Sequence, residues 1–403
     1  MQETLFQISS AGAYFAHGIF IYALIIYAQS ITGTTARSGL LFALLYAPML
    51  LLGLYAGAMA DRRSRKRILF WSQICSGLLS LAASAVITMG RSDLAMPVLL
   101  ALCPFYGAAL AFMPATRLAF VANLVPEEAI QRCTVVLKLL NVAAIAGGPL
   151  IAGWVKARAD WPTLFAVPVA LWVASTLLLL PLRVRRETSV VSGDARSWTD
   201  LKEGLRLLVR TDILWGLTLL SGVIFCLVSG PIQVLVPGFA KDVLGVGEVE
   251  RGTLVGIFGG GLLLGGILSA GLNHVRGRGR LLVGSLCLSA LLFCGFGYQT
   301  SFGPALLLLG LCSTAGGIFY SLVPATLQAA TPDQFRGRVL SVYYLLLLGG
   351  PALGAAGFGW VASALGLGLA LRLAGVGALL VSGVSAFTLR SITHYTVEPG
   401  LKT

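Results

Sequence analysis

The stretch Gly57-Ala-Met-Ala-Asp61-Arg62-Arg63-Ser64-Arg65-Lys66-Arg67 places five cations and one carboxylate between two long apolar blocks. The block before it, residues 38–60, contains no Asp, Glu, Lys or Arg, and neither does the block from residue 68 to residue 90. About 20 apolar residues are enough to cross the hydrocarbon core of a bilayer. The stretch therefore predicts a charged loop between two membrane-spanning helices.

The rest of the chain has the same composition. Of its 403 residues, 57% are hydrophobic and 11% are charged, against roughly 25% charged residues in an ordinary soluble domain. No charged residue lies between Glu3 and Arg37 or between Arg280 and Asp333. This composition excludes soluble enzymes and nucleic-acid binders, despite a net charge of +13. Alternating strands of about ten residues, which an outer-membrane barrel requires, are absent.

Apolar blocks between turn and charge signals predict an all-α membrane protein with twelve spanning helices. The expected spans are residues 7–30, 38–60, 68–89, 96–122, 129–155, 162–182, 213–239, 250–272, 281–299, 304–330, 337–364 and 367–389. The polar segment 183–211 divides the chain into residues 1–182 and 212–403. We expect two six-helix bundles joined by a cytoplasmic linker that contains a short amphipathic helix.

The predicted loops differ strongly in their content of Lys and Arg. Alternate loops collect 22 of these residues on one side of the membrane and six on the other. Cytoplasmic loops carry the excess of Lys and Arg in membrane proteins. We therefore expect a multi-pass protein of the cell (inner) membrane with both termini in the cytoplasm.

The two halves of the sequence repeat one another. The segment from Pro114 to Glu128 recurs in shortened form from Pro324 to Gln334, and each is followed by an arginine six residues after its second proline. Such repeats are the usual construction of secondary transporters, whose substrate site lies between the halves. A Gly-Pro pair followed by small residues also occurs in both halves, and it allows a helix to bend and to pack closely. The gating candidates from these pairs are Gly148, Pro149, Gly350 and Pro351. A simple proline kink is the alternative interpretation.

The loop from Gly57 to Arg67 resembles the signature G-x-x-x-D-R-x-G-R-[KR] of the major facilitator superfamily, with Ser64 at the position of the usual glycine. The run from Thr32 through Pro48 to Arg67 looks like the branch that contains enterobactin-type and macrolide-type exporters, as does the segment from Pro324 to Arg338. The resemblance implies the major facilitator fold, two six-helix repeats, and transport as the function.

The resemblance also implies a latch that closes the cytoplasmic side. Asp61 would bind the N-terminal end of the eleventh helix, near residues 331–338, where free N–H groups and the helix dipole favour an anion. Arg65, one turn beyond Asp61, is the expected second partner, and Gly57 allows close packing. The alternative is that these cations only anchor the topology.

Polar residues within the predicted spans form two stripes at helical spacing, which we expect to line one water-filled pocket. Lys138 lies roughly 14 Å into its helix and is costly there unless it has a role or reaches back to the surface. Arg117 and Arg372 lie nearer to helix ends and are expected to be anchors. The substrate and coupling candidates are Tyr14, His17, Lys138, Asn141 and, from the repeat offset, Tyr344. A buried histidine bonded to a backbone carbonyl is the alternative for His17.

These features predict a secondary active transporter that exports a small organic solute or amphiphile by alternating access. The alternatives are a uniporter or importer of an anionic solute, a flippase of a lipid-like substrate, and a non-transporting receptor on the same fold. Motifs of intramembrane hydrolysis, nucleotide binding and metal binding are absent, so we expect no enzyme activity, no cofactor and no metal. The expected partners are an anionic or amphiphilic small molecule, protons and membrane lipids, with no nucleic acid, and the protein is expected to be a monomer.

Overall fold

Every regular element in the computed structural model is a helix, within the part of the chain that it describes. The described residues are 2–184, 206–271, 278–332 and 335–388, and the side chains at positions 54, 57, 58, 61, 62, 92 and 386–388 are not described. Twelve helical spans are long and apolar enough to cross a membrane. The predicted fold class and the number of spanning helices are therefore confirmed.

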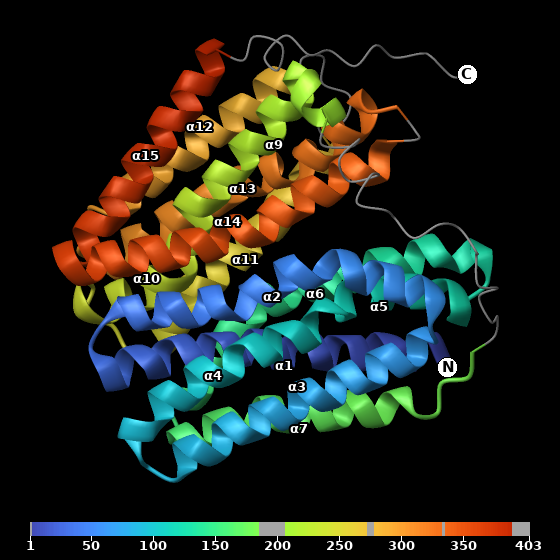
Figure 1. Ribbon diagram of the computed structural model, residues 1–403. Helices are drawn as coiled ribbons and strands as arrows, with labels where there is room; N and C mark the ends of the chain where they lie inside the picture. Colours follow the sequence, from blue (N-terminus) through green and yellow to red (C-terminus); the bar gives the residue numbers. More distant parts are fainter. Residues whose placement is uncertain (1, 185–205, 272–277, 333–334, 389–403) are drawn as a thin grey trace.

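The first half of the chain forms one bundle of six spans (Figure 1). Its helices are α1 (Gln2–Thr32), α2 (Thr35–Arg62), α3 (Arg65–Thr88), α4 (Ser92–Ala111), α5 (Met113–Leu124), α6 (Glu127–Lys156) and α7 (Trp161–Leu179). The second half forms the other bundle. Its helices are α9 (Asp212–Ile224), η1 (Phe225–Ser229), α10 (Gly230–Asp242), α11 (Glu248–Gly271), α12 (Arg278–Phe296), α13 (Phe302–Ala330), α14 (Arg336–Leu365) and α15 (Leu367–Thr388).

Two spans that we expected to be continuous are interrupted near a proline. In the fourth span, α4 ends at Ala111 and α5 begins at Met113, directly before Pro114. In the seventh span, the π-helical turn η1 precedes the pair Gly230-Pro231. A proline within a helix removes one backbone donor and its ring crowds the carbonyl four residues earlier. A break or a π-turn accommodates this crowding.

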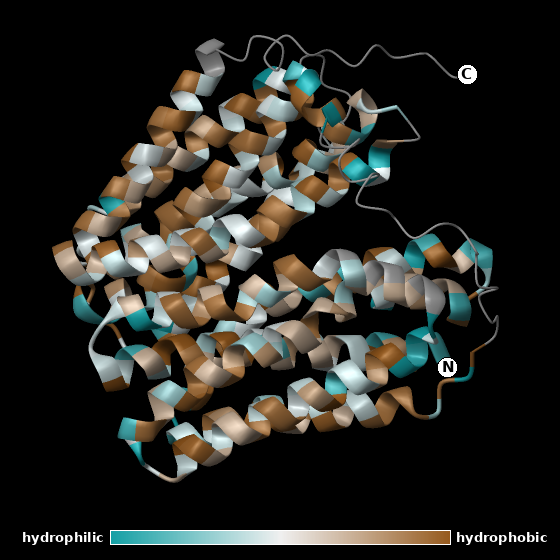
Figure 2. Ribbon diagram, in the orientation of Figure 1, coloured by the Kyte–Doolittle hydropathy of each residue, from teal (hydrophilic) through white to brown (hydrophobic). Residues whose placement is uncertain are grey.

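The two bundles lie close together at one end of the molecule and diverge toward the other (Figure 1). They diverge at the end where α1 begins, which we call the N-terminal side. The loops at residues 32–35, 156–161, 242–248 and 365–367 lie at the other end, which we call the opposite side. Brown, apolar residues run along the lengths of the helices, and teal, hydrophilic residues gather at their ends (Figure 2). This pattern is the one that a bilayer imposes, with charged residues outside the hydrocarbon.

Most of the predicted linker, residues 183–211, lies outside the described residues, and so does most of the amphipathic helix expected there. Of that helix only the last turn, residues 206–210, is described, and it is helical. The division into the domains 1–182 and 212–403 with a linker between them therefore stays a prediction.

Candidate functional site

Small residues bring α6 and α11 into backbone contact on the opposite side. A Cβ at Gly252 would collide with the carbonyl oxygen of Pro149, and one at Gly153 would collide with the carbonyl oxygen of Glu248. A Cβ at Gly259 would collide with the backbone of Ala146. Helices approach this closely only where side chains are small. The two bundles are therefore in direct contact along this pair of helices.

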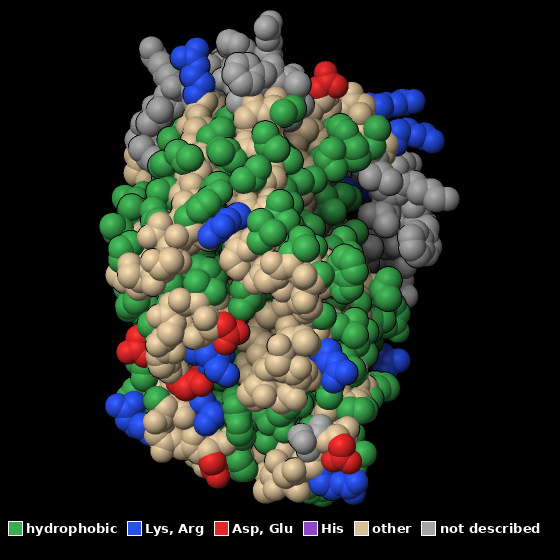
Figure 3. Space-filling view, turned by 90° about the vertical axis from the view of Figure 1, so that its left-hand side faces the viewer, with side chains coloured by type: hydrophobic (Ala, Val, Ile, Leu, Met, Phe, Trp, Pro, Cys, Tyr) green, Lys and Arg blue, Asp and Glu red, His purple; other side chains and the backbone are tan. Residues whose placement is uncertain are grey.

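The symmetry-related pair, α2 and α14, makes an equivalent contact. A Cβ at Gly39 would collide with the carbonyl oxygen of Ala355, and one at Gly359 with that of Thr35. The Thr35 hydroxyl donates a hydrogen bond to the carbonyl oxygen of Gly359 at 3.0 Å. We call the five residues Gly39, Gly153, Gly252, Gly259 and Gly359 the glycine seam. All five glycines are buried. Figure 3 shows the molecule from the opposite side, where hydrophobic side chains and a few Lys, Arg, Asp and Glu form the surface.

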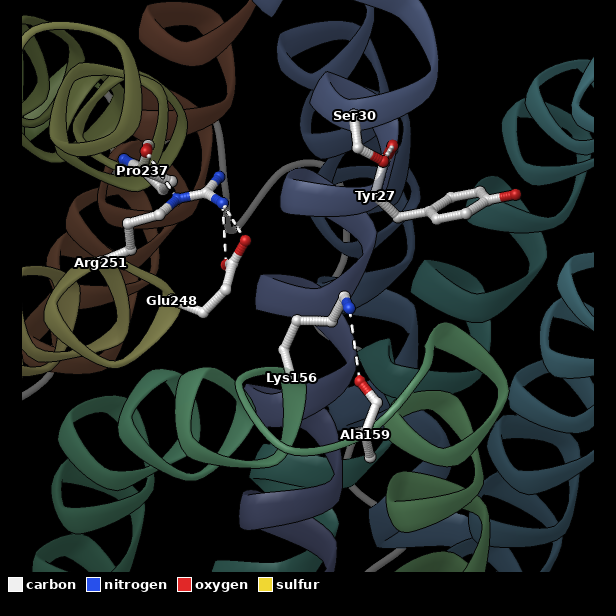
Figure 4. A network of polar contacts seen from close by, with 7 residues as sticks. All are labelled: Tyr27, Ser30, Lys156, Ala159, Pro237, Glu248 and Arg251. Carbon is white, nitrogen blue, oxygen red and sulfur yellow. Dashed lines mark hydrogen bonds and ion pairs between the residues drawn. The ribbon is translucent and has the colours of Figure 1, made fainter. Parts of the chain in front are cut away.

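Polar side chains beside the glycine seam are paired within their own bundle (Figure 4). Arg251, which is 4% exposed, binds the carboxylate of Glu248 at 2.7 Å and donates from Nε to the carbonyl oxygen of Pro237 at 3.0 Å. In the other bundle, Lys156 donates to the carbonyl oxygen of Ala159 at 3.3 Å. Neutral hydrogen bonds cross between the bundles, such as the one from Gln29 Nε2 to the Val234 carbonyl oxygen at 2.7 Å.

The loop between α6 and α7, on the opposite side of the first bundle, ends in an N-cap at Asp160. The Asp160 carboxylate accepts hydrogen bonds from the hydroxyl and the backbone N–H of Thr163, at 2.6 and 3.0 Å. These two hydrogen bonds hold the pKa of Asp160 below its ordinary value, the hydroxyl contributing most. The start of α7 on the opposite side is therefore well defined.

Toward the N-terminal side, the same helix faces carry two of the predicted site residues. Lys138 lies eleven residues before Pro149 on α6, and Tyr344 lies eleven residues before Ala355 on α14. Eleven residues are close to three turns, so each pair shares one face of its helix. Pro149 and Ala355 touch the other bundle, and Lys138 and Tyr344 are both exposed. The two side chains therefore lie on the faces that the bundles turn toward each other, at equivalent positions of the repeat.

Tyr14 and Asn141 come together between α1 and α6. The two helices touch at Gly18 and Gly148, where a Cβ on either would collide with the other backbone. One turn nearer the N-terminal side of α1, the Tyr14 side chain interacts with Asn141, which is exposed. The guanidinium carbon of Arg117, on α5, lies 4.9 Å from the centre of the Tyr14 ring. These three helices therefore contribute to one polar cluster inside the first bundle.

His17 packs against α4 within the first bundle. Its ring stacks on Tyr106 of α4, with the ring centres 6.0 Å apart, and its Nδ1 atom has no hydrogen-bond partner in the described structure. Ser10, on the same face of α1, is fully buried. Ser10 therefore does not line the pocket that we expected between the polar residues of α1 and α6. His17 is half-buried, and its role in such a pocket stays a prediction.

The glycines of the two Gly-Pro pairs pack at equivalent places, whereas the carbonyl oxygens of the two prolines have different partners. Gly148 touches α1 and the Pro149 carbonyl touches α11. A Cβ at Gly350 would collide with Gly222 of α9, and the carbonyl of Pro351 touches Gly230 of α10. Each glycine of a pair therefore packs within its own bundle, at the helix that occupies the equivalent place in the repeat.

The predicted latch is only partly described. The side chains of Gly57 and Asp61 and residues 333–334 lie outside the described residues, so the contact of Asp61 with the start of α14 stays a prediction. Arg65 is described, and it binds the carbonyl oxygen of Ala119 at 3.0 Å and the Oδ1 atom of Asn123 at 2.9 Å. It therefore joins the start of α3 to the end of α5 within the first bundle.

Sequence reasoning assigned Arg117 to a helix end as an anchor, and this was wrong. The side chain is 1% exposed and lies under Tyr14. The sequence offered one signal, Pro114, because the helix break at Phe112 directly precedes Met113-Pro114. Arg372, the other expected anchor, donates from Nε to the carbonyl oxygen of Gly297 at 3.1 Å and lies over the Tyr298 ring.

Two six-span bundles that are in contact on one side of the membrane, with ionisable residues on the facing surfaces toward the other, define a membrane carrier. The family model for transmembrane secretion effectors (MFS_3) matches residues 23–398, and the chain belongs to this family of the major facilitator superfamily. It is therefore a transporter and not an enzyme.

Two of the relatives of this chain are named as exporters. Macrolide efflux protein A of Enterococcus faecalis is 25% identical over 306 residues, which cover 74% of this chain and 92% of that protein. The enterobactin exporter EntS of Shigella dysenteriae serotype 1 is 24% identical over 386 residues, which cover 95% of this chain and 90% of that protein.

Solved structures of the same fold include transporters of several kinds. A bacterial homolog of the human lysosomal transporter Spinster, in an inward-facing and unoccupied conformation, has a TM-score of 0.78 at 14% identity, over 99% of this chain and 98% of that chain. A D-xylose-proton symporter has a TM-score of 0.77 at 13% identity, over 98% and 99%. At these identities the likeness establishes the fold alone.

Proposed function

We propose that this protein is a secondary active exporter of a small organic solute, anionic or amphiphilic, across the inner membrane. Its two termini lie in the cytoplasm, and the N-terminal side is the cytoplasmic side. The 22-to-6 distribution of Lys and Arg supports this orientation. The exporters among its relatives support the direction of transport, whereas the solved structures of the same fold include a proton symporter.

The glycine seam carries the proposal. It joins the bundles backbone to backbone on the opposite side, while Lys138 and Tyr344 are exposed on the facing surfaces three turns away. This arrangement is that of an inward-facing carrier, which receives its solute from the cytoplasm. Opening the seam and closing the cytoplasmic side would release the solute outside, as alternating access requires.

In this cycle the bundles, residues 1–182 and 212–403, move as units and residues 183–211 link them. Asp61, with Gly57 and Arg65, latches the cytoplasmic side when it is closed, and the pairs Gly148-Pro149 and Gly350-Pro351 adjust the packing as the bundles move. Tyr14, His17, Lys138, Asn141 and Tyr344 bind the solute or couple its movement. Coupling by proton antiport, with the monomer as the working unit in the lipid bilayer, completes the proposal.

Flux in membrane vesicles tests this function. Inside-out vesicles expose the cytoplasmic side to the medium, so we expect them to accumulate a radiolabelled macrolide or enterobactin when a proton gradient is imposed. These are the solutes in the names of the two relatives. Accumulation without any gradient, up to equal concentrations, would indicate a uniporter, and uptake only by right-side-out vesicles would indicate an importer. Movement of a fluorescent lipid between leaflets would indicate a flippase, and no flux of any probe would favour a receptor.

We expect Asp61→Asn to weaken the latch in the same vesicles while the protein stays folded. An anion at a helix N-terminus contributes about 0.3 to 2 kcal/mol, which shifts a closed-to-open ratio by roughly 2- to 30-fold. The variant should therefore transport more slowly, and a cysteine at Val135, on the Lys138-bearing face of α6, should react faster with a maleimide from the cytoplasmic side. Wild-type flux together with wild-type reactivity in Asp61→Asn would contradict the latch.

A further inference from the structure

Arg117 is a buried cation without a counter-charge. Its side chain is 1% exposed, and its Nε, Nη1 and Nη2 atoms are all buried without a hydrogen-bond partner. The ion pairs among described side chains join other residues, namely Arg91 with Asp93, Arg132 with Glu3, and Arg251 with Glu248. By contrast, the buried guanidinium of Arg251 has both a carboxylate and a carbonyl oxygen. An arginine at membrane depth normally has such partners, because an unpaired charge there is strongly destabilising.

One face of the Tyr14 ring takes the place of a partner. The guanidinium carbon lies 4.9 Å from the ring centre, within the range of a cation–π contact. Such a contact is weaker than an ion pair, and it satisfies none of the N–H groups. Five N–H donors in a planar fork match the two oxygens of a carboxylate or the oxygens of a phosphate or sulfonate. The guanidinium of Arg117 therefore lacks an oxyanion partner. The described residues of this chain do not provide one.

Tyr14 connects the buried guanidinium of Arg117 with an exposed residue. Tyr14 is half-buried and lies between Arg117 and Asn141, and Asn141 is exposed. Asn141 lies three residues after Lys138 on α6, so it borders the surface that faces the second bundle. A change of the Tyr14 rotamer would uncover the guanidinium, and the amide of Asn141 would then be placed to donate to the same oxyanion.

We propose that Arg117, with Tyr14 as a movable cover and Asn141 as a second donor, forms an oxyanion subsite that binds the carboxylate, phosphate or sulfonate of the transported solute. The inference rests on the proposed function, because the oxyanion belongs to the solute that the exporter would carry. It adds which group of that solute binds inside the first bundle. The solute reaches Lys138 first and exchanges this exposed cation for the buried one. The Tyr14 ring holds the guanidinium in place while the subsite is empty.

Binding to the purified full-length protein in lipid nanodiscs tests the subsite without any flux. The probes are benzoate and benzenesulfonate, each compared with its uncharged amide, benzamide or benzenesulfonamide, by thermal shift and by calorimetry. In the wild type we expect the anions to raise the melting temperature more than their amides. Arg117→Met should lower the affinity for the anions at least tenfold, which corresponds to about 1.4 kcal/mol, and should leave the weak response to the amides unchanged.

The melting temperature of the ligand-free protein distinguishes a binding role of Arg117 from a structural role. A structural role predicts that removing the side chain lowers this temperature. Methionine keeps the unbranched chain of Arg117 and removes its unpaired charge, so Arg117→Met should melt at the same temperature as the wild type or higher. Arg117→Lys restores the charge without the fork and should recover part of the anion affinity. Arg372→Met is the matched control, because Arg372 also lies over a tyrosine ring, and it should keep the wild-type preference for anions.

Several outcomes would overturn the subsite. These are equal responses to anions and amides in the wild type, an unchanged anion response in Arg117→Met, or a large loss of stability in that variant. If Lys138→Gln removes the anion response and Arg117→Met keeps it, the exposed lysine and not the buried arginine selects the charge. Failure of the proposed function is distinguishable, because absent flux in vesicles with intact, Arg117-dependent anion binding would refute export and leave the subsite in place.

Discussion

His17 is the residue best suited to couple transport to protons. The carboxylates of this chain lie in loops or at helix ends, so none is available midway through a predicted span. An imidazole titrates near neutrality when unperturbed, and the Nδ1 atom of His17 has no hydrogen-bond partner among the described residues. The groups known to face it are Tyr106 and, on its own helix, Tyr14, and neither phenol titrates between pH 5 and 8.

We therefore predict that transport by the wild type changes as pH falls below neutrality and that His17→Gln flattens this dependence while solute exchange continues. Protonated His17 would help to hold an anion, and loss of the proton on the other side would release it. The measurement is flux in proteoliposomes with the internal and external pH set independently. Identical pH profiles for the wild type and His17→Gln would exclude His17 as the proton carrier.

The comparison of His17 with Arg117 shows what the sequence can predict for a single residue. The sequence placed both residues within predicted spans, and both lie on helices of the structure. The rotation of a helix about its axis, which decides between a bundle interior and a solute pathway, depends on neighbours far away in sequence. Arg117 is covered by Tyr14, more than 100 residues earlier, so no local pattern predicts its burial.

At the scale of the helix, the glycine seam fixes how closely α6 and α11 approach. The spacing of the small residues suggested close packing, but it did not say whether the partner lay in the same bundle or in the other one. Gly148 packs within its bundle, and Gly153, five residues later, packs across to Glu248 and Gly252. Five residues rotate the helix by more than one turn, so a small change of position exchanges one partner for the other.

We predict that Gly252→Ala shifts the protein away from the inward-facing conformation. The added Cβ would collide with the Pro149 carbonyl and with Gly153, and both belong to a backbone that cannot move without separating the bundles. Spin labels on α2 and α14 near the opposite side should report longer distances in this variant than in the wild type, and export should slow.

Gly260→Ala, on the same helix, is the control for this prediction. A Cβ at Gly260 has no heavy atom within 4 Å, and alanine favours a helix over glycine by about 1 kcal/mol. This variant should keep the wild-type distances and be at least as stable. If both variants give the same distances, helix propensity and not the bundle contact explains the effect.

At the scale of the whole molecule, the orientation in the membrane rests on the loops. Ser64, between α2 and α3, and Ser301, before α13, are both exposed and lie at opposite ends of the structure. In a cysteine-free background, a membrane-impermeant maleimide added to intact cells should label Ser301→Cys and leave Ser64→Cys unlabelled until the cells are opened. Labelling of Ser64→Cys from outside would reverse the orientation and, with it, the proposed direction of export.

The sequence was sufficient to predict the whole architecture because a bilayer permits so few solutions. Twelve apolar spans and a repeat of six determined the fold, and the spans agree with the helices to within a few residues at most ends. The side of the molecule on which the two bundles separate could not be predicted. The sequence of each span is the same in the inward-facing and outward-facing states of a carrier, so it does not indicate which state is adopted. The face of a helix that each site residue occupies depends on neighbours distant in sequence, so Tyr14 and Asn141 could be placed on their helices but the contact of Arg117 with Tyr14 could not be predicted.

The chemistry of the seam also determines which physical conditions the transport cycle responds to. On the opposite side, the ion pairs among described residues, Arg91 with Asp93 and Arg251 with Glu248, each stay within one bundle. The contacts that must break for the carrier to open there are van der Waals contacts and neutral hydrogen bonds. Dissolved salt screens charges and leaves such contacts unaffected. The step that opens the glycine seam should therefore proceed at nearly the same rate in dilute and in concentrated salt, so ionic strength on the opposite side would not set the pace of the transport cycle.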